Sequence, residues 1–307
     1  MSLRLNFIVG CTASGKSSLG VELARRTGGE IISIDSMKVY RGMDIGTAKP
    51  SVEVRAEVPH HLIDVVDPWE EFSVAQYVSL ADKAIQQIHV RGKKIFVVGG
   101  TPLYIKALSE GLFEGPGADP QTREQLQALA QQEGTPVLHE RLQQADPVAA
   151  GRIHRNDLRR LVRALEVFEL TGRPISALQE QWDKERPRYD SRFLGLRWSK
   201  DDLHLRIKER VLRMMERGLV DEVRSLLALE RPLSTAARQA VGYAEVIDHL
   251  QGGPDLAHTV EAIKINTRQL AKAQRTWLRR FRTIEWIDLT ADATVATVAD
   301  SVMDRLA

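Results

Sequence analysis

The stretch GCTASGKSS, at residues 10–18, combines glycines, a lysine and hydroxyls at the spacing that holds phosphate groups in a loop. It satisfies the pattern G-x-x-x-x-G-K-[ST], with a strand-like run before it and helix formers after it. The glycines let backbone N–H groups turn toward an anion, Lys16 adds a mobile cation, and the Ser17 hydroxyl can bind Mg²⁺. We therefore predict a phosphate site made of Gly10, Thr12, Ala13, Ser14, Gly15, Lys16 and Ser17.

Asp35 and Thr101 directly follow two other apolar, strand-like runs. A carboxylate at Asp35 can bind Mg²⁺ through water or accept a proton from an incoming nucleophile, but it can equally cap a turn. Thr101 follows two glycines, where backbone and ligand can approach closely, yet it can also cap a helix that begins at Pro102. Both readings stay open for each residue.

Few acids accompany the phosphate loop. Asp35 and Asp64 are the only well-placed acids in the first hundred residues, and the strand ending at Val98 is followed by Gly-Gly-Thr. A nucleoside triphosphatase usually places a second acid at a strand end to hold Mg²⁺ and water. This pattern favours a phosphate ligand other than a hydrolysed nucleoside triphosphate.

Three groups of basic residues lie in predicted helices, where spacings of three and four place side chains on one face. Each group alone can be a solvated helix face, but three groups beside a phosphate loop favour a polyanionic partner. The groups are Arg206, Arg210, Arg213 and Arg217; Lys264, Arg268, Lys272, Arg275 and Arg279; and Arg159, Arg160 and Arg163.

The composition is that of a globular protein, with 307 residues, 43% hydrophobic and 27% charged residues and a net charge of +2. The single cysteine, Cys11, excludes an intrachain disulfide. No apolar stretch approaches the length of a membrane span, and no targeting segment precedes the first strand-like run. We expect a cytoplasmic, monomeric protein.

Strand and helix signals alternate over the first hundred residues, with strands expected at 5–9, 30–34, 61–66 and 94–98. This alternation predicts an α/β fold, a P-loop parallel sheet with helices on both faces. A Gly- and Pro-rich linker at 110–120 then leads into a helical stretch without strand signals. We predict a core formed by 1–120 and 191–307, and an inserted all-helical domain at 121–190.

Several segments together resemble one family, the tRNA dimethylallyltransferases, also called tRNA isopentenyltransferases. The resemblance extends over nearly the whole chain, and the run from Met43 to Pro50 after a phosphate loop is its most specific part. The matching segments are GCTASGKSS, IISIDSMKVYRGMDIGTAKP, PHHLIDVVDP, VVGGTPLYIKALSEGL, RALEV, VGYAEVI and TRQLAKAQRTWLRR.

The resemblance implies transfer of a dimethylallyl group from dimethylallyl diphosphate to N6 of the adenosine 3′ of the anticodon in tRNA. The phosphate loop would hold the diphosphate with Mg²⁺ at Ser17, Asp35 would take the amine proton and Thr101 would assist. Arg210 is our candidate for a further diphosphate clamp, from its position and periodicity. The implied contacts with the tRNA anticodon stem-loop are Asp35, Ser36, Met37, Lys38, Thr101, Arg123, Arg159, Arg160, Arg163, Gly242, Tyr243, Lys272, Gln274, Trp277 and Arg279.

The sequence departs from the family pattern at a few of these positions. Lys38 and Arg159 stand where Gln is common, Ala273 replaces a usual Arg, Cys11 a usual Pro, and Pro102 a usual Gly or Met. The departures at 38, 159 and 273 put the tRNA sequence preference in doubt rather than the chemistry.

Three alternatives remain at this stage. A small-molecule kinase fits the loop and Asp35 but leaves the basic groups and the helical insertion unexplained. A noncatalytic RNA-binding protein explains the basic groups but not the loop with Asp35. An isopentenyltransferase acting on free AMP keeps the chemistry, but the helical insertion argues against it.

Overall fold

The computed structural model describes residues 3–112, 115–179 and 187–306. The chain divides into two compact units, a core unit of 1–109 with 187–307 and a helical unit of 110–186. The helical unit begins earlier than the predicted residue 121 because its own side chains bind the linker. Arg163 donates to the carbonyls of Pro116 and Gly117, and the Asp119 amide donates to Glu166.

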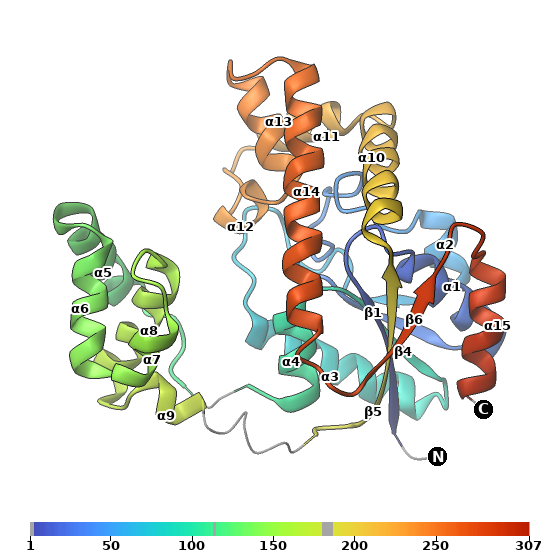
Figure 1. Cartoon of the computed structure of the whole chain (residues 1–307), viewed down its shortest axis with the longest axis horizontal. Coiled ribbons are helices and arrows are strands. Elements are labelled where there is room, and N and C mark those ends of the chain that lie inside the picture. The colour runs from blue at the N-terminus through green and yellow to red at the C-terminus, as the bar shows by residue number, and fades with distance from the viewer. Residues whose placement is uncertain (1–2, 113–114, 180–186, 307) are drawn as a thin grey trace. The chain divides into compact units, whose positions relative to one another are not determined.

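A six-stranded, all-parallel sheet forms the centre of the core unit, in the order β3-β2-β4-β1-β5-β6 (Figure 1). The predicted α/β fold is therefore confirmed. Strands β2 and β4 are buried along their whole length, as parallel strands covered on both faces should be. The strands are β1 Arg4–Gly10, β2 Glu30–Ile34, β3 His60–His61, β4 Ile95–Gly99, β5 Asp190–Trp198 and β6 Ile284–Leu289.

The register of the sheet brings three strand ends level with one another. Val9 of β1 and Ile34 of β2 both pair with Gly99 of β4. The segments that follow these strands therefore start side by side at the carboxyl edge of the sheet, where ligands bind in parallel α/β sheets.

Helices of the core unit surround this sheet and extend beyond its carboxyl edge, where α10, α11, α13 and α14 gather (Figure 1). Those helices share a buried apolar cluster that includes Ile207, Val223, Tyr243 and Ile263. The helices are α1 Lys16–Thr27, α2 Val52–Glu57, α3 Val74–Val90, α4 Pro102–Glu110, α10 Lys200–Glu216, α11 Leu219–Leu227, α12 Thr235–Arg238, α13 Tyr243–Leu250, α14 Leu256–Leu278 and α15 Val295–Leu306.

Local sequence signals set several helix boundaries. Ser73 and Gln76 form a capping box at the start of α3, and α1 ends at Gly28, whose φ of 63° suits glycine. The strand predicted over 61–66 is wrong for most of its length. Leu62 and Asp64 adopt φ values of 63° and 56°, which break the extended conformation directly after β3.

The helical unit has an apolar core of its own. Leu138, Leu142, Leu161 and Val167 are fully buried at its centre. Its helices are α5 Pro120–Glu133, α6 Thr135–Ala145, α7 Pro147–Arg152, α8 Leu158–Thr171 and α9 Ile175–Gln179.

None of the helices described is long and apolar enough to cross a membrane.

Candidate active site

The phosphate loop folds as a turn between β1 and α1. Gly15 has a φ of 90° and Ala13 a φ of 62°, so the chain reverses there and directs the first amides of α1 toward a common point. These amides have no acceptor within the helix, which makes the turn suitable for an anion. The Ser14 hydroxyl is buried and has no hydrogen-bond partner in the described part of the chain, so it is available to a bound ligand.

Two side chains from outside the loop hold its carbonyl groups. The Trp198 Nε1 donates to the Ser14 carbonyl at 2.9 Å, and the Arg206 Nε donates to the Ala13 carbonyl at 2.9 Å. The Arg206 guanidinium also lies 4.2 Å from the centre of the Trp198 ring. With both carbonyls held on the outside, the loop amides remain directed inward.

Gln274 of α14 connects the loop to the neighbouring strand end. Its Oε1 accepts the Thr12 amide at 2.8 Å, and its Nε2 donates to the Gly100 carbonyl at 2.8 Å. A Cβ at Gly100 would lie 2.5 Å from the Gly10 carbonyl oxygen, so this close approach requires glycine. The predicted RNA contact Gln274 is thus engaged inside the core unit.

Asp35 and Thr101 meet at the carboxyl edge of the sheet. Asp35 Oδ1 accepts the amides of Met37 and Lys38 at 2.9 and 3.3 Å, while no described residue bonds its Oδ2. Thr101 Oγ1 accepts the Ser36 amide at 3.1 Å. Asp35 therefore caps a turn with one oxygen and presents the other, and Thr101 holds that turn in place.

Three cations lie within electrostatic range of the Asp35 carboxylate. Burial lowers the pKa of Lys16 to about 8; Asp35 opposes this shift, while Lys38 and Arg210 add to it. Burial likewise lowers the pKa of Lys38 and of Arg210, and Asp35 opposes both shifts. No ion pair engages Lys16, Lys38 or Arg210 among the residues that the structure describes, so the cluster has an excess of positive charge suited to an anion.

The expected Mg²⁺ position fits these residues poorly. The Ser17 hydroxyl, the expected metal ligand, lies 3.4 Å from the Lys38 ammonium and is its hydrogen-bond acceptor. Across residues 3–112, 115–179 and 187–306, no three His, Cys, Asp or Glu side chains gather as a metal site. Mg²⁺ prefers oxygen ligands, usually one or two carboxylates together with substrate phosphates and water, so the feature that disfavours it here is the adjacent Lys38 ammonium.

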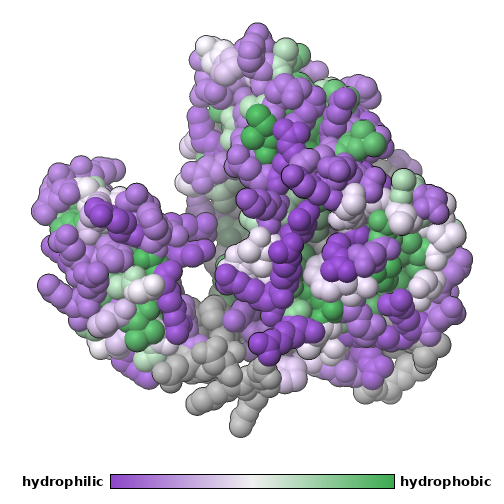
Figure 2. Space-filling view, in the orientation of Figure 1, coloured by the Kyte–Doolittle hydropathy of each residue, from purple (hydrophilic) through white to green (hydrophobic). Residues whose placement is uncertain are grey.

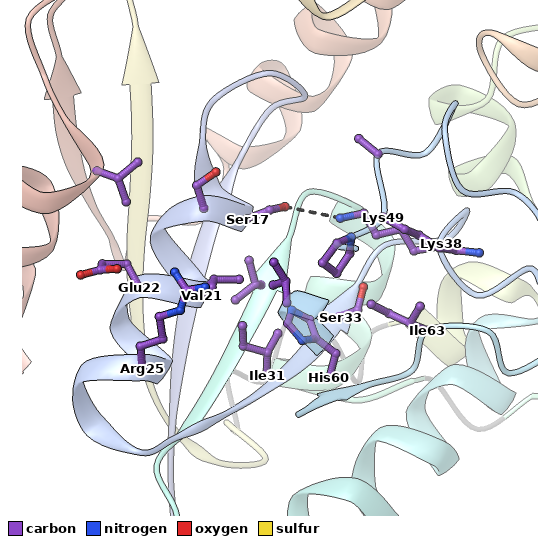
Figure 3. A pocket seen from close by; sticks show the side chains of 16 residues that line it. Ser17, Val21, Glu22, Arg25, Ile31, Ser33, Lys38, Lys49, His60 and Ile63 are labelled. Atoms are coloured by element: carbon purple, nitrogen blue, oxygen red, sulfur yellow. Dashed lines mark hydrogen bonds between the residues drawn. The ribbon is translucent and has the colours of Figure 1, made fainter. Parts of the chain in front are cut away.

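A cavity of about 510 Å³ opens beside the loop (Figure 3). Ser17 and Lys38 belong to its polar wall, together with Ser33 and His60. Its apolar wall comes from α1, β2, β4 and the segment that follows Lys49, with Val21, Ile31, Val54, Ile63 and Val98.

The predicted RNA contacts on α14 are mostly accessible. Lys272 and Arg279 are exposed, Trp277 is half-buried, and Arg280 stacks on the Trp277 ring at 4.8 Å. No ion pair engages Lys272 or Arg279 among the residues that the structure describes. The face of α14 in Figure 2 is mainly hydrophilic.

The predicted RNA contacts in the helical unit differ in whether their side chains are exposed or bound to a buried acid. Arg159 and Arg160 are exposed on α8, and Arg160 pairs with Asp157 at 3.3 Å. Arg123 and Arg163 instead donate to the fully buried carboxylate of Glu166, at 2.7 and 2.6 Å. Burial acts to raise the pKa of Glu166, but the hydrogen bonds from both arginines outweigh it and hold that pKa below its ordinary value.

Gly242 and Tyr243 lie in the interior rather than on a surface. Gly242 starts α13 with a φ of 95°, and the fully buried Tyr243 donates its hydroxyl to Glu222 at 2.6 Å. The same Glu222 carboxylate accepts the amides of Asp44, Ile45 and Gly46. The Tyr243 ring is covered by the core and has a structural role there, and the RNA contact at this position stays a prediction.

Sequence reasoning assigned no role in the phosphate loop to Arg206, which it named only as a member of a basic helix stripe. It missed Trp198, Glu166 and Glu222 altogether. These three are single side chains whose partners are distant in sequence, and no local pattern marks them.

Comparison with known proteins places this geometry in a family. The family model for IPP transferase matches residues 38–281, and the model for isopentenyl transferase matches residues 3–59. The chain is 50% identical over 297 residues to the tRNA dimethylallyltransferase of Geobacter metallireducens, covering 96% of each chain.

Solved structures agree. The tRNA isopentenylpyrophosphate transferase of Bacillus halodurans is 40% identical, with a TM-score of 0.71 over 99% of this chain and 96% of that one. A eukaryotic dimethylallyltransferase, captured acting on tRNA, is 28% identical, with a TM-score of 0.82 over 99% of this chain and 79% of that one. The chain belongs to the tRNA dimethylallyltransferase family of IPP transferases.

Proposed function

We propose that the chain transfers the dimethylallyl group of dimethylallyl diphosphate to N6 of the tRNA adenosine that lies 3′ of the anticodon. The observation that carries this proposal is the cluster at the carboxyl edge of the sheet, where Lys16, Lys38 and Arg210 lie within electrostatic range of Asp35. The cations can bind a diphosphate, and the carboxylate can accept the proton that the adenine amine loses. The relatives named above support the choice of donor and acceptor.

In the proposed reaction, the phosphate loop and the three cations hold the diphosphate. The bond between C1 of the dimethylallyl group and the diphosphate oxygen breaks as the adenine N6 forms a bond to C1. The cations stabilise the charge that develops on the leaving diphosphate. Asp35 Oδ2 takes the proton that N6 loses, while Oδ1 stays bound to the turn. Because an adenine amine is a weak nucleophile, orientation contributes more than the base.

The acceptor in this proposal is the anticodon stem-loop of tRNA, bound by one copy of the chain. Exposed basic residues occur on both units, Lys272 and Arg279 in one and Arg159 and Arg160 in the other. Arginine and lysine contacts to phosphates position an RNA without reading its bases. The target base must leave its stack to reach Asp35, which is a base-flipping step.

A parallel labelling experiment tests the proposal. The protein is incubated with unmodified tRNA and dimethylallyl diphosphate labelled in the prenyl group, and separately with tRNA and γ-labelled ATP. We expect prenyl label on the tRNA and intact ATP. Consumption of ATP without prenyl label on RNA would support the kinase reading, and prenyl label on added AMP in preference to tRNA would support the free-nucleotide reading.

A further inference from the structure

Lys38 is a buried cation in a position where the phosphate-loop pattern led us to expect a metal ion. Lys38 is only 9% exposed, and its ammonium lies 3.4 Å from the Ser17 hydroxyl (Figure 3). A divalent cation bound to Ser17 would have to share that hydroxyl with the ammonium. The site therefore already contains a positive charge next to Ser17.

Three of the four carboxylate oxygens of the two acids Asp35 and Asp64 are engaged. Asp64, the other strand-end acid, binds Lys49 through one oxygen at 2.6 Å and Arg55 through the other at 2.5 Å. Asp35 uses Oδ1 for the amides of Met37 and Lys38. Of these two acids, only Asp35 Oδ2 has no partner among the described residues, and a Mg²⁺ ion at Ser17 would compete for it with the proton that the proposed reaction delivers there.

The charge of the cluster also favours an anion over a second cation. Lys16, Lys38 and Arg210 all interact electrostatically with a single carboxylate, Asp35, and the charge of Arg210 also acts on Lys16 and Lys38. Neighbouring Lys49 is already neutralised by Asp44 and Asp64. A bound diphosphate would supply the negative charge that the cluster lacks, whereas a divalent cation arriving alone would be repelled.

We propose that the Lys38 ammonium serves as a built-in counter-cation beside Ser17, so that this enzyme holds diphosphate with little dependence on Mg²⁺. The inference rests on the proposed function of the phosphate loop as a diphosphate site. A neutral Gln at this position would carry no charge and would leave the Ser17 hydroxyl to a metal ion. Lys38 is thus a positioning and charge-balancing residue that sets the metal requirement.

Calorimetric titration of the full-length protein with inorganic diphosphate tests this without any turnover. The affinity is measured once with excess Mg²⁺ and once with EDTA, for the wild type, Lys38→Gln and Lys38→Arg. Lys83→Gln, which removes an exposed lysine of α3, is the matched control. A thermal unfolding scan of each variant checks that it is folded, and Lys38→Arg keeps the charge in case Lys38→Gln does not fold.

The deciding quantity is the ratio of the two affinities. We expect EDTA to change the diphosphate affinity of the wild type, Lys38→Arg and Lys83→Gln by less than about threefold. EDTA should weaken the affinity of Lys38→Gln by about tenfold or more, which corresponds to roughly 1.4 kcal/mol of binding free energy. An equal ratio in the wild type and Lys38→Gln would overturn the inference and leave the proposed function standing. No binding of diphosphate to the wild type in either condition would overturn both.

Discussion

At the scale of single residues, the two oxygens of Asp35 have different tasks. Oδ1 accepts two amides of the following turn, and Oδ2 has no partner within the described ranges. Asp35 can therefore cap a turn and act as a catalytic base at the same time. Because the two oxygens have different roles, a substitution that keeps the turn acceptor can test the catalytic role without disturbing the fold.

Asp35→Asn keeps an oxygen for the turn but removes the base. We expect the rate of prenyl transfer to fall by about 10²–10⁴-fold, the usual contribution of a general base. Affinity for tRNA should stay within a few-fold, as filter binding can measure. Asp35→Ala, which also removes the turn acceptor, serves as the comparison. Loss of folding and of tRNA binding in Asp35→Asn would make Asp35 a structural residue.

Local sequence predicted the residues of the phosphate loop, because a glycine turn, a lysine and a helix start are encoded within a few positions. It could not predict that the Tyr243 ring is buried against Glu222 or that Gln274 joins Thr12 to Gly100. Those contacts join segments far apart in the chain, and only the tertiary fold brings them together.

At the scale of elements, the phosphate loop depends on helices that come late in the chain. Trp198 at the end of β5 and Arg206 of α10 hold the loop from one side, and Gln274 of α14 holds it from the other. The loop precedes the helical unit in sequence, whereas all three residues that hold it follow that unit.

Trp198→Phe removes the donor to the Ser14 carbonyl and keeps an aromatic ring beside Arg206. A hydrogen bond contributes about 0.5–1.5 kcal/mol net, so we expect the KM for dimethylallyl diphosphate to rise about two- to tenfold with a smaller change in kcat. Steady-state kinetics measure the split, and Trp286→Phe on β6 is the control. An unchanged KM in Trp198→Phe would show that the loop keeps its shape without this donor.

In the helical unit, Glu166→Gln should destabilise the packing of α5 on α8. Removing one partner of a buried ion pair costs about 3–5 kcal/mol, and the partly exposed arginines place the expected loss near about 3 kcal/mol. Amide hydrogen exchange over 119–178 measures it, with Glu169→Gln on the exposed face of α8 as the control. Exchange equal to that of the control would contradict the role given to Glu166.

The Glu166 carboxylate also makes the stability of the helical unit depend on pH. The pKa of Glu166 is lower in the folded state than its ordinary value, so its contribution to stability is present above the unfolded pKa, near about 4.3. That contribution is lost as the pH falls through the lower folded pKa. The difference between the wild type and Glu166→Gln should therefore shrink in acid and be largest at neutral pH.

The strand alternation made most of the sheet predictable, since buried parallel strands appear as short apolar runs. The segment after β3 was not predictable, because nothing in the letters at Leu62 and Asp64 requires a positive φ. The early start of the helical unit also depends on Arg163 and Glu166, which bind the linker from α8.

At the scale of the whole molecule, the basic residues have unequal roles. Arg123 and Arg163 are bound to Glu166, whereas Arg159, Lys272 and Arg279 are exposed. The sequence showed the stripes of charge but not which charges are engaged. An RNA that contacts the exposed residues should show the salt dependence of a polyelectrolyte.

The double variant Lys272→Gln and Arg279→Gln should weaken tRNA binding and flatten its dependence on salt. Each lost phosphate contact lowers the slope of log affinity against log salt by about 0.7–0.9, so we expect a decrease of about one to two. Fluorescence anisotropy across a salt series measures the slope, and Lys93→Gln is the control. A slope equal to that of the wild type would exclude these two side chains from the RNA interface.

The most direct test of the central claim is to identify the product. Purified protein, dimethylallyl diphosphate and unmodified tRNA are incubated, the tRNA is digested, and the nucleosides and their positions are read by mass spectrometry. The account predicts N6-isopentenyladenosine at the position 3′ of the anticodon with the wild type and almost none with Asp35→Asn. Unmodified tRNA with the wild type, or equal product with Asp35→Asn, would contradict it.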